Sequence, residues 1–111
     1  MAKKILNSCN VTKLDLINSE ASKAFKDMPA GAEVRGAAIV EEIDEETGEA
    51  KRYSYLYTDS GVYAGISASI RRGIEEFIDL MADEPDKTYK ATVEKRPSAS
   101  GREFFAIYFA E

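Results

Sequence analysis

The stretch EVRGAAIVEEIDEETGEAKRYSYLYTDSGVY, residues 33–63, decides the fold of this chain. Apolar and polar residues alternate along much of it, which is typical of β-strands with one buried face. Two short segments rich in Asp, Ser and Gly interrupt the alternation, and each is typical of a tight turn. We therefore predict three consecutive strands joined as a meander, over residues 33–43, 49–58 and 62–66.

The first of these strands contains a glycine in its interior. Under strict alternation one face would carry Val34, Gly36, Ala38 and Val40. Glycine weakens a strand and commonly marks a bend or a close approach of another backbone. We predict that Gly36 has one of these two roles.

Beyond the meander the apolar period changes from that of a strand to that of a helix. Residues 67–82 predict a helix with Ser67 or Ser69 as its N-cap. Gly73 lies inside this helix, where it costs about 1 kcal/mol relative to alanine, so we predict that it permits close packing on the sheet. The apolar stripe of the helix consists of Ile70, Ile74, Phe77, Ile78 and Met81.

Two further strands end the chain, over residues 87–95 and 103–110, and the segment PSASG joins them as a turn. Three strands, a helix and two strands is the order of an OB-fold, a five-stranded Greek-key barrel with its helix between strands three and four. Gly36 favours this barrel, because the long first strand of such a barrel bends. A β-grasp or another small α+β sheet stays an alternative.

The predicted OB-fold domain covers residues 31–111, and residues 1–30 form an N-terminal extension. Residues 1–18 alternate weakly, which indicates a short strand or an arm. Residues 19–28 predict a short helix with Ser19 as its N-cap.

Composition excludes several function classes. The chain has no histidine, which removes Ser-His-Asp and Cys-His catalysis and most zinc sites. The single cysteine, Cys9, cannot form an internal disulfide, and no apolar run is long enough for a signal peptide or a membrane span. We expect a cytosolic binding protein that uses no metal or cofactor, rather than an enzyme.

Charge is unevenly distributed along the chain. The net charge is −5, but six of the 20 acidic residues lie in residues 41–49, and the remaining 14 nearly balance 15 Lys and Arg. Residues 87–102 contain five Lys and Arg against Glu94 alone. On an OB-fold this cationic segment would form one wall of the binding groove. We predict that phosphates run past Lys51, Arg52, Lys90, Lys95, Arg96 and Arg102; the alternative for each is an ordinary solvated surface.

Tyrosines are concentrated on the second and third predicted strands. Tyr53, Tyr55 and Tyr57 alternate along the second strand, and Tyr63 follows on the third. These rings are either core or an exposed platform on which bases stack, at about 1–3 kcal/mol per base. Burial of three hydroxyls would require a partner for each, which favours the platform. We predict that bases stack on Tyr55, Tyr57 and Tyr63, with Tyr53 as a further candidate.

A set of short motifs in matching order carries a family resemblance. The chain resembles the single-stranded-DNA-binding protein of Salasvirus-type podophages, which replicate linear genomes by protein priming. The resemblance runs from about residue 22 to residue 109. Its landmarks are Ala24-Phe25-Lys26, Met28-Pro29, Gly31, Ala38, Gly61-Val62-Tyr63, Ile66-Ser67, Phe77-Ile78-Asp79-Leu80, Ser98-Ala99-Ser100-Gly101, Phe104-Phe105 and Ile107.

This resemblance implies a protein that coats and protects displaced single strands in many copies during phage replication, in the cytoplasm of the bacterial host. It implies single-stranded DNA as the partner, self-association along the strand, and base stacking on tyrosines. Among the tyrosines of this chain, the resemblance assigns base stacking to Tyr63. For Tyr53, Tyr55 and Tyr57, base stacking is predicted from the strand alternation alone. Two alternatives stay open. One is a protein-interaction module whose acidic segment mimics nucleic acid, and the other is a nucleotide binder whose ligand stacks on the same tyrosines.

Overall fold

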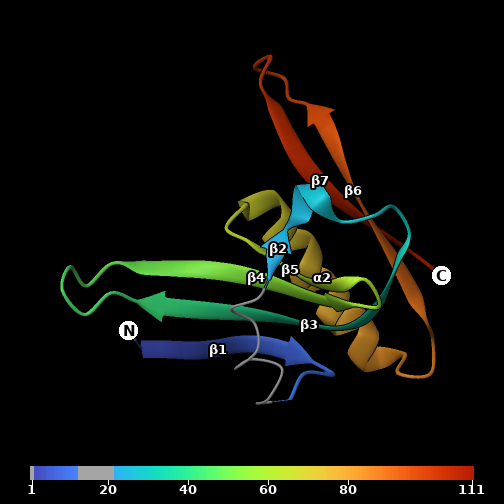
Figure 1. The fold of residues 1–111 in the computed structure, drawn as a ribbon, viewed down its shortest axis with the longest axis horizontal. Helices are drawn as coiled ribbons and strands as arrows, with labels where there is room; N and C mark the ends of the chain where they lie inside the picture. Colours follow the sequence, from blue (N-terminus) through green and yellow to red (C-terminus); the bar gives the residue numbers. More distant parts are fainter. Residues whose placement is uncertain (1, 13–21) are drawn as a thin grey trace.

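A curled, open β-sheet and one α-helix make up the fold in the computed structural model, which describes residues 2–12 and 22–111 (Figure 1). The helix, α2, spans Ala68–Asp83, and a short 3₁₀ turn, η2, spans Phe25–Asp27. The strands of the sheet are β1 (Ala2–Cys9), β2 (Lys23–Ala24), β3 (Ala32–Ile43), β4 (Ala50–Thr58), β5 (Gly61–Gly65), β6 (Tyr89–Pro97) and β7 (Glu103–Ala110).

The sheet is centred on β3. Along the sheet the strand order is β2, β5, β4, β3, β6, β7. β1 also pairs with β3 but is not part of this linear order. On one edge β3 pairs with β4, and on its other edge it pairs first with β6 and then with β1. From β3 onward the elements follow the predicted order of three strands, a helix and two strands.

The predicted five-stranded Greek-key barrel is observed only in part. Over residues 2–12 and 22–111 the sheet has seven strands and stays open, because β7 pairs only with β6 while β5 pairs with β4 and β2. The two additional strands come from the first 30 residues. The sheet is therefore mainly antiparallel and curled around α2 rather than closed on itself.

Gly36 lies where β1 ends against β3. An added Cβ there would lie 2.6 Å from the carbonyl oxygen of Asn10 and 2.9 Å from that of Cys9. Both atoms belong to the backbone, so no side-chain rotation could relieve the contact. The prediction of a close backbone approach at Gly36 is confirmed.

A bulge beside Gly36 changes which side chains share a face. The register of β3 against β4 shifts between Val34 and Gly36, which adds one residue to the alternation. Val34 consequently packs with Ala37 and Ile39 in the main core, while Ala38 and Val40 face the other side of the sheet. The predicted common face of Val34, Ala38 and Val40 is wrong for this reason.

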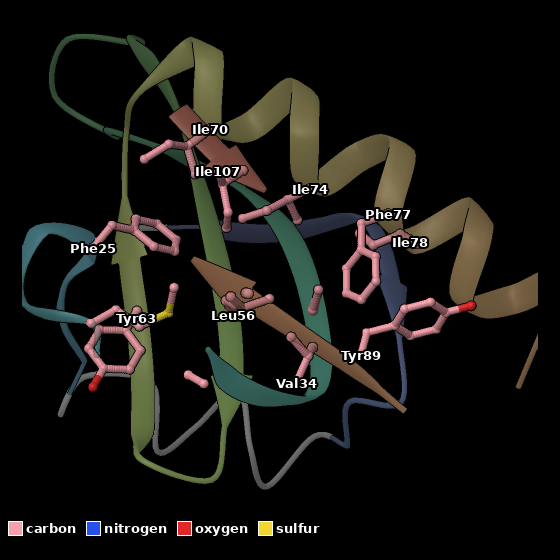
Figure 2. Close-up of a cluster of buried hydrophobic side chains, with 14 of the residues drawn as sticks. Phe25, Val34, Leu56, Tyr63, Ile70, Ile74, Phe77, Ile78, Tyr89 and Ile107 are labelled. Atoms are coloured by element: carbon pink, nitrogen blue, oxygen red, sulfur yellow. The ribbon is translucent and has the colours of Figure 1, made fainter. Parts of the chain in front are cut away.

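The main core lies between α2 and the sheet (Figure 2). All five residues of the predicted helix stripe are buried, and the Ser67 hydroxyl accepts a hydrogen bond from the Ile70 amide at 3.4 Å. An added Cβ on Gly73 would lie 2.8 Å from a methyl of Ile107, so the predicted close packing is confirmed. The residues facing the stripe include Phe25, Val34, Leu56, Tyr63, Tyr89 and Ile107.

Aromatic contacts join α2 to the hairpin formed by β6 and β7. The rings of Phe77 and Phe109 stack with their centroids 3.8 Å apart and an interplanar angle of 12°. The Tyr89 ring meets Phe77 edge-on at 5.2 Å. Phe77 therefore contacts both strands of the hairpin at once.

An ionic network lies where α2 leads into β6. The Lys87 ammonium lies 2.9 Å from a carboxylate oxygen of Glu111 and 3.0 Å from one of Glu84, and the Tyr89 hydroxyl donates to Glu84 at 3.2 Å. The hydrogen bond from Lys87 lowers the pKa of Glu84, and the bond from Tyr89 acts in the same direction. Exposed pairs of this kind stabilise a fold little.

The N-terminal predictions have mixed outcomes. The predicted strand or arm is observed as β1, which pairs with β3 from Ala2 opposite Ile43 onward. The predicted helix over 19–28 falls partly outside the described residues. In its described part it is wrong: β2 pairs in parallel with β5, and η2 then supplies a single tight turn that buries Phe25. The domain boundary at residue 30 stays a prediction.

In the described part of the chain no helix is long and apolar enough to cross a bilayer.

The buried hydroxyl of Ser54 gives a stability prediction. Ser54 is 1% exposed on the core face of β4, and its Oγ has no hydrogen-bond partner among residues 2–12 and 22–111. Because an unsatisfied buried polar group is costly, Ser54→Ala is expected to raise the free energy of unfolding by about 1 kcal/mol, measured by urea denaturation. The matched control is Thr58→Val, since the Thr58 hydroxyl donates to the Gly61 carbonyl at 2.8 Å and its loss should destabilise by about 1 kcal/mol. A loss of stability in Ser54→Ala equal to that of the control would contradict the prediction.

Candidate nucleic-acid interface

Three of the predicted stacking residues share one face of β4. Across the strands, Tyr53 lies opposite Val40, Tyr55 opposite Ala38 and Tyr57 opposite Gly36. These tyrosines pack with the two β3 side chains in a second cluster, on the side of the sheet away from α2. The prediction that the three rings share a face is confirmed.

Exposure of these rings is lower than predicted. Tyr55 and Tyr57 are each 8% exposed, and only Tyr53 is half-buried. The Tyr53 and Tyr55 rings are tilted by 33° with centroids 6.5 Å apart, so they do not form a flat platform. The predicted water-exposed platform is therefore wrong for Tyr55 and Tyr57, because both sides of β4 are covered.

Tyr63 lies on the opposite side of the sheet. The tight turn between β4 and β5 places Tyr63 opposite Leu56, and directly opposed residues share a face. Tyr63 is 2% exposed in the main core, and its hydroxyl lies 3.2 Å from that of Ser60 (Figure 2). The prediction that Tyr63 joins the other three rings is wrong.

Lys51 and Arg52 lie among acidic residues at the hairpin of β3 and β4. Arg52 lies opposite Glu41 and its Nε donates to that carboxylate at 3.4 Å. A shallow pocket of about 250 Å³ surrounds Lys51, and it is lined by Glu42, Asp44, Glu49, Lys51 and Tyr53. The carboxylates around these two cations make this hairpin a poor surface for phosphates.

The other four predicted cations gather on the hairpin of β6 and β7, which projects from the body of the molecule (Figure 1). Lys90, Lys95 and Arg96 lie on β6 and Arg102 follows the turn, and all four are exposed. Two of them form surface ion pairs, Lys95 with Glu103 at 3.4 Å and Arg96 with Glu94 at 3.3 Å. Such exposed pairs are weak, so these cations can exchange their carboxylates for phosphates.

The outer face of the same hairpin carries two exposed aromatic rings that sequence reasoning missed. Phe104 and Tyr108 on β7 are 39% and 42% exposed. They lie on the other face of β7 from Phe105, Ile107 and Phe109, whose side chains turn toward the core. The available clue was that both faces of this strand are aromatic, which is unusual for a strand with one solvated face.

One cation on the outer face contacts a ring. The Arg96 guanidinium carbon lies 5.0 Å from the centroid of the Tyr108 ring, within the range of a cation–π contact. Across the strands, Arg96 lies opposite Phe104. Arg96 is therefore positioned between two exposed rings.

The two charged hairpins are separated in space. In Figure 1 the acidic hairpin of β3 and β4 and the cationic hairpin of β6 and β7 end at different extremities of the molecule. The principal extents of the molecule are 41, 39 and 24 Å. The net charge therefore does not describe the surface that the β6–β7 hairpin presents to a polyanion.

Comparison with known proteins finds relatives of this chain. Two curated proteins, each named single-stranded DNA-binding protein, from Bacillus phage PZA and Bacillus phage phi29, are 26% identical over 90 residues. For each, the matched region is 77% of this chain and 73% of the relative. No solved structure matches the chain.

A family model described as phage single-stranded DNA-binding protein matches residues 9–110. This family is defined by DNA binding and is not a family of enzymes. The match begins at the last residue of β1, continues through every later strand and α2, and includes the whole cationic hairpin. The chain therefore belongs to the phage single-stranded DNA-binding protein family.

Proposed function

We propose that this protein binds single-stranded DNA without sequence preference and coats displaced strands during phage DNA replication. The observation that carries the proposal is the cluster of Lys90, Lys95, Arg96 and Arg102 on a projecting hairpin, in a chain of this family. Phosphate contacts through exposed cations attract any strand, because phosphates are the same in every sequence. Nothing in such a contact selects a base.

The proposal assigns the protein to the cytoplasm of the bacterial host, where replication supplies displaced strands. Many copies would lie side by side on one strand and associate with one another along it. Coating by neighbouring copies keeps a strand out of reach of nucleases. This arrangement needs no metal and no cofactor.

We also propose that residues 31–111 form an OB-like domain to which residues 1–30 are added as an N-terminal extension. The order of three strands, a helix and two strands supports this arrangement. In OB-folds the loop between the last two strands is one wall of the nucleic-acid groove. The equivalent loop here is the tip of the cationic hairpin, and its position supports a phosphate path beside it.

Neutralising the hairpin tests the proposal. The variant replaces Lys90, Lys95, Arg96 and Arg102 by glutamine, and binding to labelled oligo-dT is followed by fluorescence anisotropy at several salt concentrations. At about 0.1 M salt we expect at least a tenfold loss of affinity. The slope of log K against log salt should fall in magnitude by up to about 3, since each phosphate contact on a single strand contributes about 0.7.

A matched control separates position from net charge. It replaces four exposed cations outside the hairpin by glutamine, namely Lys23, Lys26, Lys51 and Arg72. The control has the same net charge as the first variant and should bind oligo-dT within about threefold of the unmodified protein. Equal losses in the two variants would contradict the assignment of the phosphate path to the β6–β7 hairpin.

A further inference from the structure

We propose that bases stack on the outer face of the β6–β7 hairpin, with Tyr108 and Phe104 as the stacking rings. This inference rests on the proposed function and names the residues that contact the bases. It moves the stacking surface away from the tyrosine face of β4, which the alternation of the sequence favours. Single-stranded nucleic acid is the partner, because only there are base faces free.

The exposed fraction of the rings distinguishes the tyrosine face of β4 from the outer face of the β6–β7 hairpin. Phe104 and Tyr108 are 39% and 42% exposed, against 8% for Tyr55 and for Tyr57. A base needs an open ring face to stack on, and it cannot displace packed side chains without a large cost. The hairpin therefore offers open rings where β4 does not.

Strand geometry fixes which faces the hairpin residues occupy. The pairs Lys90 with Ala110, Thr92 with Tyr108, Glu94 with Ala106 and Arg96 with Phe104 lie directly opposite each other, so their side chains share the outer face. The side chain beside each ring is small or charged, which leaves the rings accessible. The alternate pairs include Ala91 with Phe109 and Val93 with Ile107, which pack toward the core.

Spacing along β7 indicates that each ring holds a different base. Phe104 and Tyr108 are four residues apart, which corresponds to about 14 Å along an antiparallel strand. One base cannot reach both rings over this distance. The backbone between two stacked bases would then cross the face between the rings.

Arg96 occupies that intervening region. Arg96 starts opposite Phe104, and its guanidinium lies 5.0 Å from the Tyr108 ring centroid, so the side chain extends from one ring toward the other. Its carboxylate partner Glu94 is itself exposed and lies 3.3 Å away. A phosphate between the stacked bases can replace Glu94 as the partner of Arg96 while the guanidinium stays near Tyr108.

The cationic surroundings favour a polyanion over an apolar protein partner. An apolar docking surface would have uncharged neighbours around its rings, whereas here the rings share a face with Lys90, Glu94 and Arg96. Flat rings beside cations are the combination that single-strand-binding surfaces use. Docking of a second protein on these rings is kept as an outcome of the test.

Alanine substitution measures how much each ring contributes to the affinity for single-stranded DNA. Tyr108→Ala and Phe104→Ala are each expected to weaken binding of oligo-dT about 5- to 100-fold, since stacking contributes about 1–3 kcal/mol per base. The salt slope should stay unchanged, because no phosphate contact is removed. Matched controls are Leu80→Ala, which removes a side chain that is 39% exposed on α2, and Tyr53→Ala on β4; both should bind as the unmodified protein does.

A tryptophan reporter locates the bases directly. The chain contains no tryptophan, so Tyr108→Trp, Phe104→Trp and Tyr53→Trp each introduce a single emitter. Oligo-dT should strongly quench the tryptophan fluorescence of the Tyr108→Trp and Phe104→Trp variants and quench that of Tyr53→Trp little. Circular dichroism of each variant, compared with the unmodified protein, shows whether the fold is kept.

Failure of this inference and failure of the proposed function give different results. If both hairpin alanine variants bind oligo-dT normally, or only Tyr53→Trp is quenched, the stacking assignment is overturned while single-strand binding stands. If the alanine variants change only self-association in sedimentation, the rings are a protein-docking surface and the assignment is again overturned. If the unmodified protein does not bind oligo-dT at low salt, the proposed function itself is wrong.

Discussion

Substitution of Phe77 by alanine is expected to lower the free energy of unfolding by about 3–5 kcal/mol, the usual range for removal of a buried aromatic ring. Phe77 is 2% exposed, and its ring stacks on Phe109 and receives the edge of Tyr89. The substitution removes the ring contacts that Phe77 makes with Tyr89 on β6 and Phe109 on β7, and it leaves a cavity. Urea denaturation followed by circular dichroism measures the loss.

Leu80→Ala on the same helix is the control for this prediction. Leu80 is 39% exposed, so its truncation should change stability by no more than about 0.5–1 kcal/mol. Below the unfolding transition, Phe77→Ala should also weaken binding of single-stranded DNA, because the hairpin loses its ring contacts with α2. A stability loss of less than about 1 kcal/mol would show that Phe77 does not fix the hairpin.

The second large effect is expected at Gly36. Gly36→Ala should lower the free energy of unfolding by about 2–3 kcal/mol, since overpacking commonly costs about 1–3 kcal/mol. The added methyl would meet the backbone carbonyl oxygens of Cys9 and Asn10 at 2.9 Å and 2.6 Å. To relieve the contact, the end of β1 must separate from β3.

Gly65→Ala is the matched control for Gly36. A Cβ at Gly65 would lie 3.2 Å from an atom of the Phe25 side chain, which can rotate, whereas a backbone carbonyl cannot. We expect a loss of no more than about 1 kcal/mol at Gly65. Hydrogen exchange should show β1 amides losing protection in Gly36→Ala only; equal effects in the two variants would refute the role of the close approach.

Much of the fold could be predicted from the apolar period alone. The period of two gave β3, β4, β6 and β7, and the helical period gave the stripe of α2, since these patterns are local consequences of burying one face. The faces of β3 could not be predicted, because a single bulge at Gly36 reverses the alternation beyond it. The pairing of β1 and β2 was also out of reach, since it depends on contacts distant in sequence.

The position of the cationic cluster could be predicted from the sequence, whereas the exposure of the aromatic rings, which depends on packing, could not. The cationic cluster follows from composition and lies on one hairpin, as expected. The role of Lys51 and Arg52 in binding phosphates stays a prediction; the register of their hairpin places them opposite Glu42 and Glu41. The burial of Tyr55 and Tyr57 could not be predicted, because alternation does not show that both sides of β4 are covered. The exposure of Phe104 and Tyr108 on β7 could not be predicted either, because their neighbours along the strand are also aromatic or apolar.

The separation of the acidic and the cationic hairpin gives the molecule a permanent electric dipole moment. For the proposed complex, we expect a nucleic-acid strand at long range to exert a torque on such a dipole and to turn the β6–β7 hairpin toward itself before any contact is made. Collisions of a net-negative protein with a polyanion are thereby made productive by orientation instead of being prevented by repulsion. Added salt shortens the range of that torque to about 10 Å at 0.1 M, so it slows capture of the strand as well as weakening the complex.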